Sequence, residues 1–195
     1  MRSSPQSPHE LKVTYRERRL PHWDLVEHPV FVTFRLHNSL PAGRVFPTER
    51  LTSGKAFVAL DRVLDTCTSG PLYLRMPEIA AVVVNSLRGG EMRFGRYQMH
   101  SFVVMPNHVH LLVTPHVVAT QWLGPLKGFI GYKANRILTR SGPFWQDESY
   151  DHLVRSDAEF DRIREYIENN PVKAALVSEA QQWIWSSAAH GEEAA

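Results

Sequence analysis

The stretch "VVMPNHVHLLVTP", residues 103–115, constrains the fold of this chain more than any other segment. Side chains alternate across a β-strand, so His108, His110 and Leu112 point to one face and the apolar residues between them point to the other. One face then belongs to the core, and the other carries two imidazoles that can reach one ion from a rigid backbone. For an isolated His-x-His, the ordinary alternative is one histidine hydrogen-bonded in the core and one solvated.

Composition limits the class of protein. The 195 residues, 43% of them hydrophobic, are enough for one sizeable core. The formal charge of +2 is too small to indicate a polyanionic partner by itself, so the distribution of charge must decide. The single cysteine, Cys67, excludes an internal disulfide. No apolar leader and no membrane-spanning segment is visible, so we expect a cytoplasmic protein without membrane contact.

Element signals predict a sheet in the middle of the chain. Strands are predicted at 30–36, 92–105, 109–114 and 151–155, and helices at 47–65, 76–90, 120–139 and 157–169. The helix at 76–90 has Pro77 near its first turn and Gly89-Gly90 at its end. This order predicts an α+β fold of ferredoxin-like (RRM-like) type, an antiparallel sheet with helices on one face.

Three regions are predicted along the chain. Residues 1–24 are rich in serine, proline and charge, which is typical of a flexible basic arm. Residues 25–176 form the folded domain. Residues 177–195 are a tail whose Trp183 and Trp185 are expected to pack on that domain.

A late helix offers a third functional element. In "EFDRIREYIENNPVKA", Tyr166 and Asn170 are separated by four residues and therefore share one helical face. Pro171 ends the helix and pushes the residue before it out of the helical region, so Asn169 is a possible substitute for Asn170. The ordinary alternative is that Tyr166 only packs and Asn170 only caps the helix.

Four blocks in this order resemble a known family. "MPNHVHLLV", "LKGFIGYKANRIL", "FWQDESYDHLVR" and "YIENNPVKAALV" are similar to the single-tyrosine HUH transposases, the insertion-sequence-200-like superfamily, and most closely to its REP-associated tyrosine transposases. The resemblance covers about residues 21–187. It implies a ferredoxin-like catalytic domain in which His108 and His110 bind a divalent metal, Asn170 is a further ligand and Tyr166 is the nucleophile.

The resemblance also implies the reaction and the substrate. Tyr166 would cleave single-stranded DNA through a covalent 5′-phosphotyrosine and leave a 3′ hydroxyl that can later rejoin, so no ATP is needed. The substrate would be DNA folded into REP-type hairpins, and the protein would act as a monomer or a homodimer. The resemblance favours Mg or Mn as the metal, although the imidazole ligands also suit zinc.

Basic residues are expected to bind the DNA backbone. The helix "GPLKGFIGYKANRILTRSG" and the N-terminal arm carry most of the candidates, although a solvated helix face has the same pattern. The predicted DNA-binding residues are Lys127, Lys133, Arg136, Arg140, Arg16, Arg18 and Arg19.

Rival residues and rival functions complete the expectations. Tyr132 and Tyr150 lack an amide four residues later, so Tyr166 is the preferred nucleophile, and His152 is expected to be structural or to contact phosphate. The alternative function is a non-catalytic nucleic-acid-binding protein derived from a transposase, because ferredoxin-like sheets often bind RNA. A TIM-barrel hydrolase is disfavoured, since that barrel takes roughly 250 residues.

Overall fold

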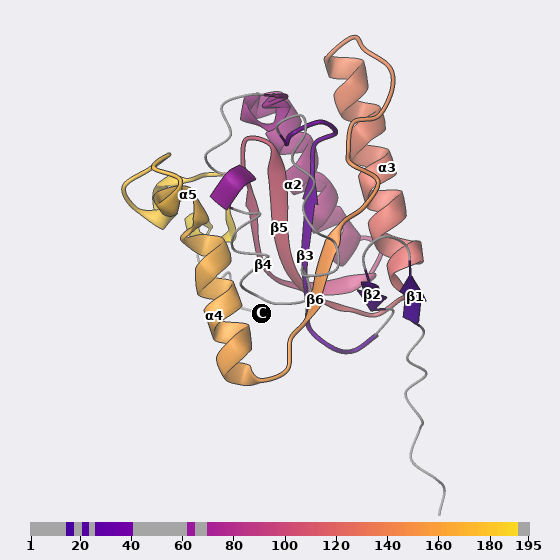
Figure 1. The fold of residues 1–195 in the computed structure, drawn as a ribbon, viewed down its shortest axis with the longest axis vertical. Coiled ribbons are helices and arrows are strands. Elements are labelled where there is room, and N and C mark those ends of the chain that lie inside the picture. The colour runs from indigo at the N-terminus through magenta and orange to yellow at the C-terminus, as the bar shows by residue number, and fades with distance from the viewer. Residues whose placement is uncertain (1–14, 18–20, 24–25, 41–61, 65–69, 191–195) are drawn as a thin grey trace, which may run out of the picture.

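A four-stranded antiparallel sheet with the order β4-β5-β3-β6 forms the centre of the molecule (Figure 1). The computed structural model describes residues 15–17, 21–23, 26–40, 62–64 and 70–190. The strands are β3 (Val30–Arg35), β4 (Tyr97–Val104), β5 (His108–Pro115) and β6 (Tyr150–Leu153). Since β5 pairs with β4 on one side and β3 on the other, the two histidines lie on a central strand that is hydrogen-bonded along both edges.

Two helices cover one face of the sheet. They are α2 (Pro77–Met92) and α3 (Ala119–Ile137), which pack against each other (Figure 1). The main core lies between them and the sheet, and Val109, Leu111 and Val113 of β5 point into it. The sequence pattern predicted this face correctly, and the α+β antiparallel class is confirmed.

The opposite face of the sheet is covered as well. Helix α4 (Asp157–Glu168) and the single turn α5 (Asn170–Lys173) lie on it (Figure 1). Phe31, Leu112 and Ile167 are the centre of a second, smaller core on this side. The prediction that all helices share one face is therefore corrected for α4, because the hydrophobic side of this helix needs Phe31 and Leu112, which point away from the main core.

The ends of α2 and β4 differ from the prediction. The helix continues through Gly89 and Gly90 to Met92, and the strand begins at Tyr97 rather than at residue 92. Gly90 does not end the helix; a Cβ atom there would collide with the Tyr97 ring, so the glycine permits a close approach between α2 and β4. Of the helix predicted at 47–65, only residues 62–64 are described, and the rest lies outside the described residues.

Short elements flank the domain. Strand β1 (Tyr15–Glu17) pairs antiparallel with β2 (Pro21–Trp23) inside the segment predicted as an arm. The single-turn helices are η2 (Tyr73–Arg75), η3 (Ala180–Gln182) and η4 (Ser187–Ala189). The tail lies along the outer edge of β4, where the Val104 amide donates to the Trp185 carbonyl at 2.8 Å. None of the helices in the described ranges has the length and apolarity needed to cross a bilayer.

Candidate functional site

The histidine pair lies under α4. His108 and His110 are both 0% exposed, and their Nε2 atoms are 3.1 Å apart. They point to the face opposite the main core, as the alternation along β5 predicts. Buried polar atoms are nearly always hydrogen-bonded, so the partners of the two rings decide which nitrogen of each carries a proton.

Two neighbours hold the other ring nitrogens. Asn107 Oδ1 lies 2.6 Å from His108 Nδ1, and the Thr33 hydroxyl lies 2.7 Å from His110 Nδ1. The Asn107 amide is oriented by its own Nδ2, which donates to the Leu64 carbonyl at 3.0 Å. Because Oδ1 can only accept, His108 carries its proton on Nδ1 and presents a lone pair at Nε2.

These contacts fit a divalent cation. When the Thr33 hydroxyl accepts from His110 Nδ1, both Nε2 lone pairs face each other across 3.1 Å, and a cation held by both nitrogens would remove the repulsion between these lone pairs. Without a cation, one shared proton can join the two nitrogens. The described residues contain no group of three or more His, Cys, Asp and Glu placed to hold a metal.

Tyr166 meets the histidine pair from α4. Its ring centroid lies 5.9 Å from that of His110 and 6.3 Å from that of Phe31, which it approaches edge-on. The Lys173 ammonium lies 4.4 Å from the centroid of the Tyr166 ring. A late helix and a central strand, far apart in the sequence, therefore bring a phenol beside two imidazoles.

Asn170 and Asn169 occupy different environments. Asn170 is 0% exposed and begins α5, directly before Pro171. Asn169 is the C-cap of α4, and its Nδ2 donates back to the Glu165 carbonyl at 3.0 Å. The helix therefore breaks between the tyrosine and the amide, as the proline predicts, and Asn170 is the buried member of the pair.

The rival tyrosines differ in position and in acidity. Tyr132 is 58% exposed on α3, on the far side of the sheet. Tyr150 contacts Phe31 edge-on, with ring centroids 6.3 Å apart, and so lies near the pair. Burial raises the pKa of Tyr150 to about 12, with the charges of Asp151 and Glu159 adding to the shift, so its phenolate is disfavoured.

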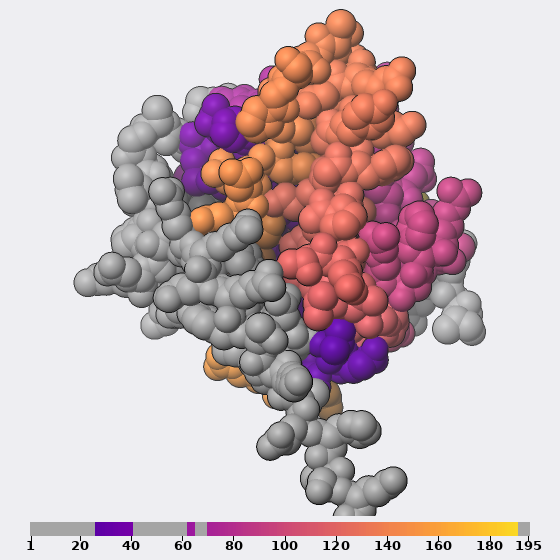
Figure 2. Space-filling model, turned by 90° about the vertical axis from the view of Figure 1, so that its right-hand side faces the viewer, coloured from indigo at the N-terminus to yellow at the C-terminus, as the bar shows by residue number. Residues whose placement is uncertain are grey.

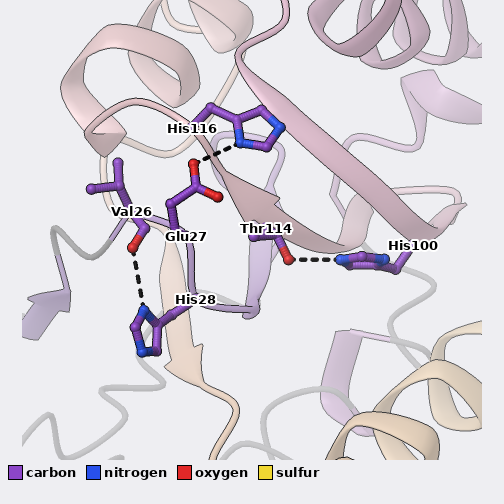
Figure 3. Close-up of polar contacts among 6 residues, drawn as sticks. All are labelled: Val26, Glu27, His28, His100, Thr114 and His116. Carbon is purple, nitrogen blue, oxygen red and sulfur yellow. Dashed lines mark hydrogen bonds and ion pairs between the residues drawn. The ribbon is translucent and has the colours of Figure 1, made fainter.

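Three other histidines contact polar atoms outside the histidine pair. His100 Nε2 lies 2.8 Å from the Thr114 hydroxyl, and His116 Nδ1 lies 2.8 Å from Glu27 Oε1 (Figure 3). Burial lowers the pKa of His100, which favours its neutral form. Figure 3 also shows His28 beside the Val26 carbonyl, so these three histidines do not converge on one point.

His152 has a structural partner. Its Nε2 lies 2.9 Å from Glu159 Oε1, which joins the edge strand β6 to the first turn of α4. Burial alone would raise the pKa of Glu159, but hydrogen bonds from His152 and from the Arg155 amide outweigh it and lower the pKa. This contact fixes the start of the helix that carries Tyr166.

Lys127 differs from the other predicted DNA-binding residues. Its ammonium donates to the Gln146 carbonyl at 2.9 Å, the Asp147 carbonyl at 3.0 Å and the Ser149 hydroxyl at 2.9 Å. Burial lowers the pKa of Lys127 to about 8, despite the opposing charge of Asp147. These donors bind the segment before β6, so a phosphate would have to displace internal acceptors.

The remaining predicted DNA-binding residues lie either on or just after α3 or in the N-terminal segment. Lys133 and Arg136 are exposed on α3, and Arg140 follows shortly after the helix. Arg16 lies in β1, where only its backbone pairing with His22 is described. Arg18 and Arg19 lie outside the described residues.

The sequence did not single out three residues that touch the candidate site. Asn107 and Thr33 orient the imidazoles, and Lys173 lies over the Tyr166 ring. Asn107 immediately precedes the His-x-His, so adjacency was an available signal. Thr33 could not be found without the register that pairs it with His110 across two strands.

Comparison with known proteins finds similarity to transposases over a part of the chain that includes the late helix α4. Residues 92–170 match the family model "Transposase IS200 like". A Haemophilus influenzae protein named "Putative REP-associated tyrosine transposase" is 27% identical over 103 residues, which span 47% of this chain and 58% of that protein. The chain therefore matches little more than half the length of that curated relative.

A solved structure shares the fold. The structure of a REP-associated tyrosine transposase bound to a REP hairpin superposes with a TM-score of 0.52, covering 87% of this chain and 81% of the other at 16% identity. The family match contains β4, β5, α3, β6 and α4, the elements that carry the histidine pair and the tyrosine. Residues 92–170 are thus similar to the IS200-like transposases, and the chain is similar in part of its sequence to a REP-associated tyrosine transposase.

Proposed function

We propose that this protein cleaves and rejoins hairpin-flanked, single-stranded DNA through a covalent 5′-phosphotyrosine on Tyr166. The observation that supports this most is the proximity of the Tyr166 and His110 rings, 5.9 Å between centroids, beside the two facing Nε2 atoms. A phenol next to two nitrogen ligands spaced for one cation is suited to metal-assisted phosphodiester transfer to a tyrosine.

The tyrosine needs assistance. With an ordinary pKa of about 10, roughly one phenol in a thousand is ionised at neutral pH. In the proposed step the Tyr166 oxygen bonds to phosphorus, the bond from phosphorus to the 3′ oxygen breaks, the phenolic proton passes to solvent, and the departing 3′ oxygen takes up a proton. The covalent bond conserves the energy of the phosphodiester, so the reverse step with a new 3′ hydroxyl rejoins DNA without ATP.

Three residues would hold the divalent ion, which we expect to be Mg²⁺ or Mn²⁺. His108 and His110 offer Nε2, and Asn170 offers its amide oxygen from the buried start of α5. When bound, the ion supplies Lewis-acid polarisation of a nonbridging phosphate oxygen. Asn107 and Thr33 keep the imidazoles oriented, and Phe31 supports the Tyr166 ring from the sheet.

The substrate class follows from the relatives. The structural relative is bound to a REP hairpin, and we propose hairpin DNA as the ligand of this chain also. Lys133 and Arg136 on α3, with Arg140 beyond it, are the proposed phosphate contacts.

Covalent trapping tests this proposal. The protein is incubated with single-stranded hairpin DNA and Mg²⁺ or Mn²⁺, and adducts are resolved on a denaturing gel. Wild type should form a protein–DNA adduct that Tyr166→Phe lacks and that His108→Ala and His110→Ala lose. Tyr150→Phe is the matched control, because Tyr150 contacts the same Phe31 ring but has its pKa raised to about 12.

Two outcomes would contradict the proposal. An adduct that survives Tyr166→Phe would assign the nucleophile elsewhere. A wild-type protein that binds the hairpin and forms no adduct with either metal would be a binding protein without strand-transfer activity.

A further inference from the structure

A groove lies between α3 and residues 142–149, on the face of the sheet opposite Tyr166. Figure 2 shows the side of the molecule that carries α3, where α3 and the segment after it adjoin in salmon and orange. The cavity has a volume of about 740 Å³, within the range of pockets that take small organic groups. Its walls include Gly128, Tyr132, Asn135 and Trp145.

Two residues of the groove wall each have a buried polar atom that lacks a partner among the described residues. Trp145 is 6% exposed, and its Nε1 donates to no described atom. Asn135 Nδ2 donates to the Gly142 carbonyl at 2.9 Å, which fixes the orientation of the amide and leaves Oδ1 without a donor there. Buried polar groups of this kind are uncommon in folded proteins.

A glycine that lines the groove is not required by the packing around it. Gly128 lies inside α3, where glycine costs about 1 kcal/mol relative to alanine. A Cβ atom at Gly128 would meet nothing within 4 Å, so no neighbouring residue requires its absence. The free space above it belongs to the groove.

Aromatic and basic side chains line the exposed side of α3. Phe129 is 53% exposed and Tyr132 is 58% exposed, although both are large hydrophobic residues. Lys133 Nζ lies 5.7 Å from the centroid of the Phe129 ring, and Arg136 Cζ lies 5.8 Å from that of Tyr132. Helix α3 contains no acidic residue, so the stripe is positive; Asp147 is a carboxylate in the groove wall, next to Lys127.

We infer that this face of α3 binds unpaired bases of single-stranded nucleic acid. Bases stack on Phe129 and Tyr132, one base enters the groove beside Tyr132, and Lys133 and Arg136 neutralise the adjoining phosphates. Alternating rings and cations are the usual surface for single strands, because every base has a face that can stack. The choice of nucleic acid as ligand rests on the proposed function; the platform itself rests on the exposed rings and the groove.

Fluorescence anisotropy tests the inference with a labelled oligo-thymidine of about 20 nucleotides and a duplex of the same length. All measurements use the Tyr166→Phe background, so binding is separated from cleavage. The single strand should bind more tightly than the duplex, and Phe129→Ala and Tyr132→Ala should each weaken it about tenfold, since stacking on one ring has that magnitude. Tyr132→Phe should restore binding to within about twofold, because the ring is kept.

Two further variants distinguish the groove from a general aromatic effect. Gly128→Leu should fold, since its Cβ meets no neighbour, and should weaken single-strand binding by filling the groove. Phe94→Ala is the matched control: Phe94 is 65% exposed and has Arg96 Cζ 5.0 Å from its ring centroid, but it lies between α2 and β4. It should bind like wild type.

The results separate the two proposals. The inference is overturned when Phe129→Ala and Tyr132→Ala bind the single strand as tightly as Phe94→Ala does. It is also overturned when these two variants lose affinity for the single strand and for the duplex by the same factor. An adduct in the trapping assay together with that result would leave the proposed function standing. Ring-dependent binding without any adduct in the Tyr166-containing protein would contradict the proposed function and support the platform.

Discussion

Asn107 Oδ1 accepts a hydrogen bond from His108 Nδ1 at 2.6 Å, and this contact sets which nitrogen of His108 faces His110. Thr33 contacts His110 in the same way, across the β3–β5 ladder. The direction of both imidazoles is therefore determined by residues that would not touch DNA.

Removing these orienting contacts should weaken metal binding. We expect Asn107→Ala and Thr33→Val each to lower Mn²⁺ affinity and the rate of adduct formation by about 10- to 100-fold, the usual effect of losing such a partner. Thr114→Val is the control, since Thr114 lies on β5 with the histidine pair but its hydroxyl contacts His100 of β4. Calorimetry with Mn²⁺ and the trapping assay measure both effects. Equal results for Thr33→Val and Thr114→Val would argue against a metal at the pair.

Lys173 should assist Tyr166. Its ammonium, 4.4 Å from the ring centroid, orients the ring and favours negative charge as it develops on the oxygen. Lys173→Gln should slow adduct formation about two- to fivefold, whereas Lys173→Arg should keep most of the rate. Arg162→Gln is the control on the exposed side of α4. Single-turnover trapping at saturating DNA gives the rates, and a Lys173→Gln rate equal to that of Arg162→Gln would contradict the assignment.

The contact between His152 and Glu159 should make the free energy of unfolding depend on pH in the acidic range. The pKa of Glu159 is lower in the folded protein than its ordinary value of 4.5, so folding favours the ionised carboxylate. Its contribution is present above pH 4.5 and is lost as the pH falls through the lowered folded pKa. Urea unfolding should show Glu159→Gln less stable than wild type at neutral pH, with the difference shrinking in acid. A difference that stays constant down to the acid limit would exclude this linkage.

Adjacent glycines in α2 should respond in opposite directions. Gly90→Ala places a methyl group against the buried Tyr97 ring, whose hydroxyl donates to the Leu87 carbonyl at 2.7 Å, and should destabilise the fold by about 1–3 kcal/mol. Gly89→Ala meets no atom within 4 Å and should stabilise it by about 0.5–1 kcal/mol. Thermal unfolding of both variants checks this. Similar melting temperatures would show that Tyr97 moves aside.

The sequence predicted the sheet and most of the element boundaries because their signals are local. Alternation along 103–115 identified the histidine face, and Pro171 identified the break after α4. The side of the sheet taken by α4 could not be predicted, since it depends on how Phe31 and Leu112 from different strands combine into a second core. Gly90 was misinterpreted for the same reason: a helix stop and a close contact with Tyr97 look alike until the partner strand is placed.

The proximity of the histidines and Tyr166 was expected from the motifs, and the structure places them together; their chemical roles stay predictions. The sequence could not predict that Lys127 donates hydrogen bonds inside the protein. Its acceptors include backbone carbonyls of a segment whose path is set by the tertiary fold. Asn135 and Trp145 gave no sequence signal either, since an unsatisfied buried atom is a property of the folded surroundings.

The unequal sizes of the two cores affect how firmly α4, the helix that carries Tyr166, is held to the sheet. The larger core holds the sheet to α2 and α3, whereas α4 is held mainly by the smaller cluster around Phe31, Leu112 and Ile167. Breaking the smaller cluster exposes far less apolar surface than global unfolding does, so this helix can detach and return while the imidazoles stay fixed in the sheet. Tyr166 thus belongs to a unit that can open without global unfolding, and under the proposed function a covalently attached strand would move with it.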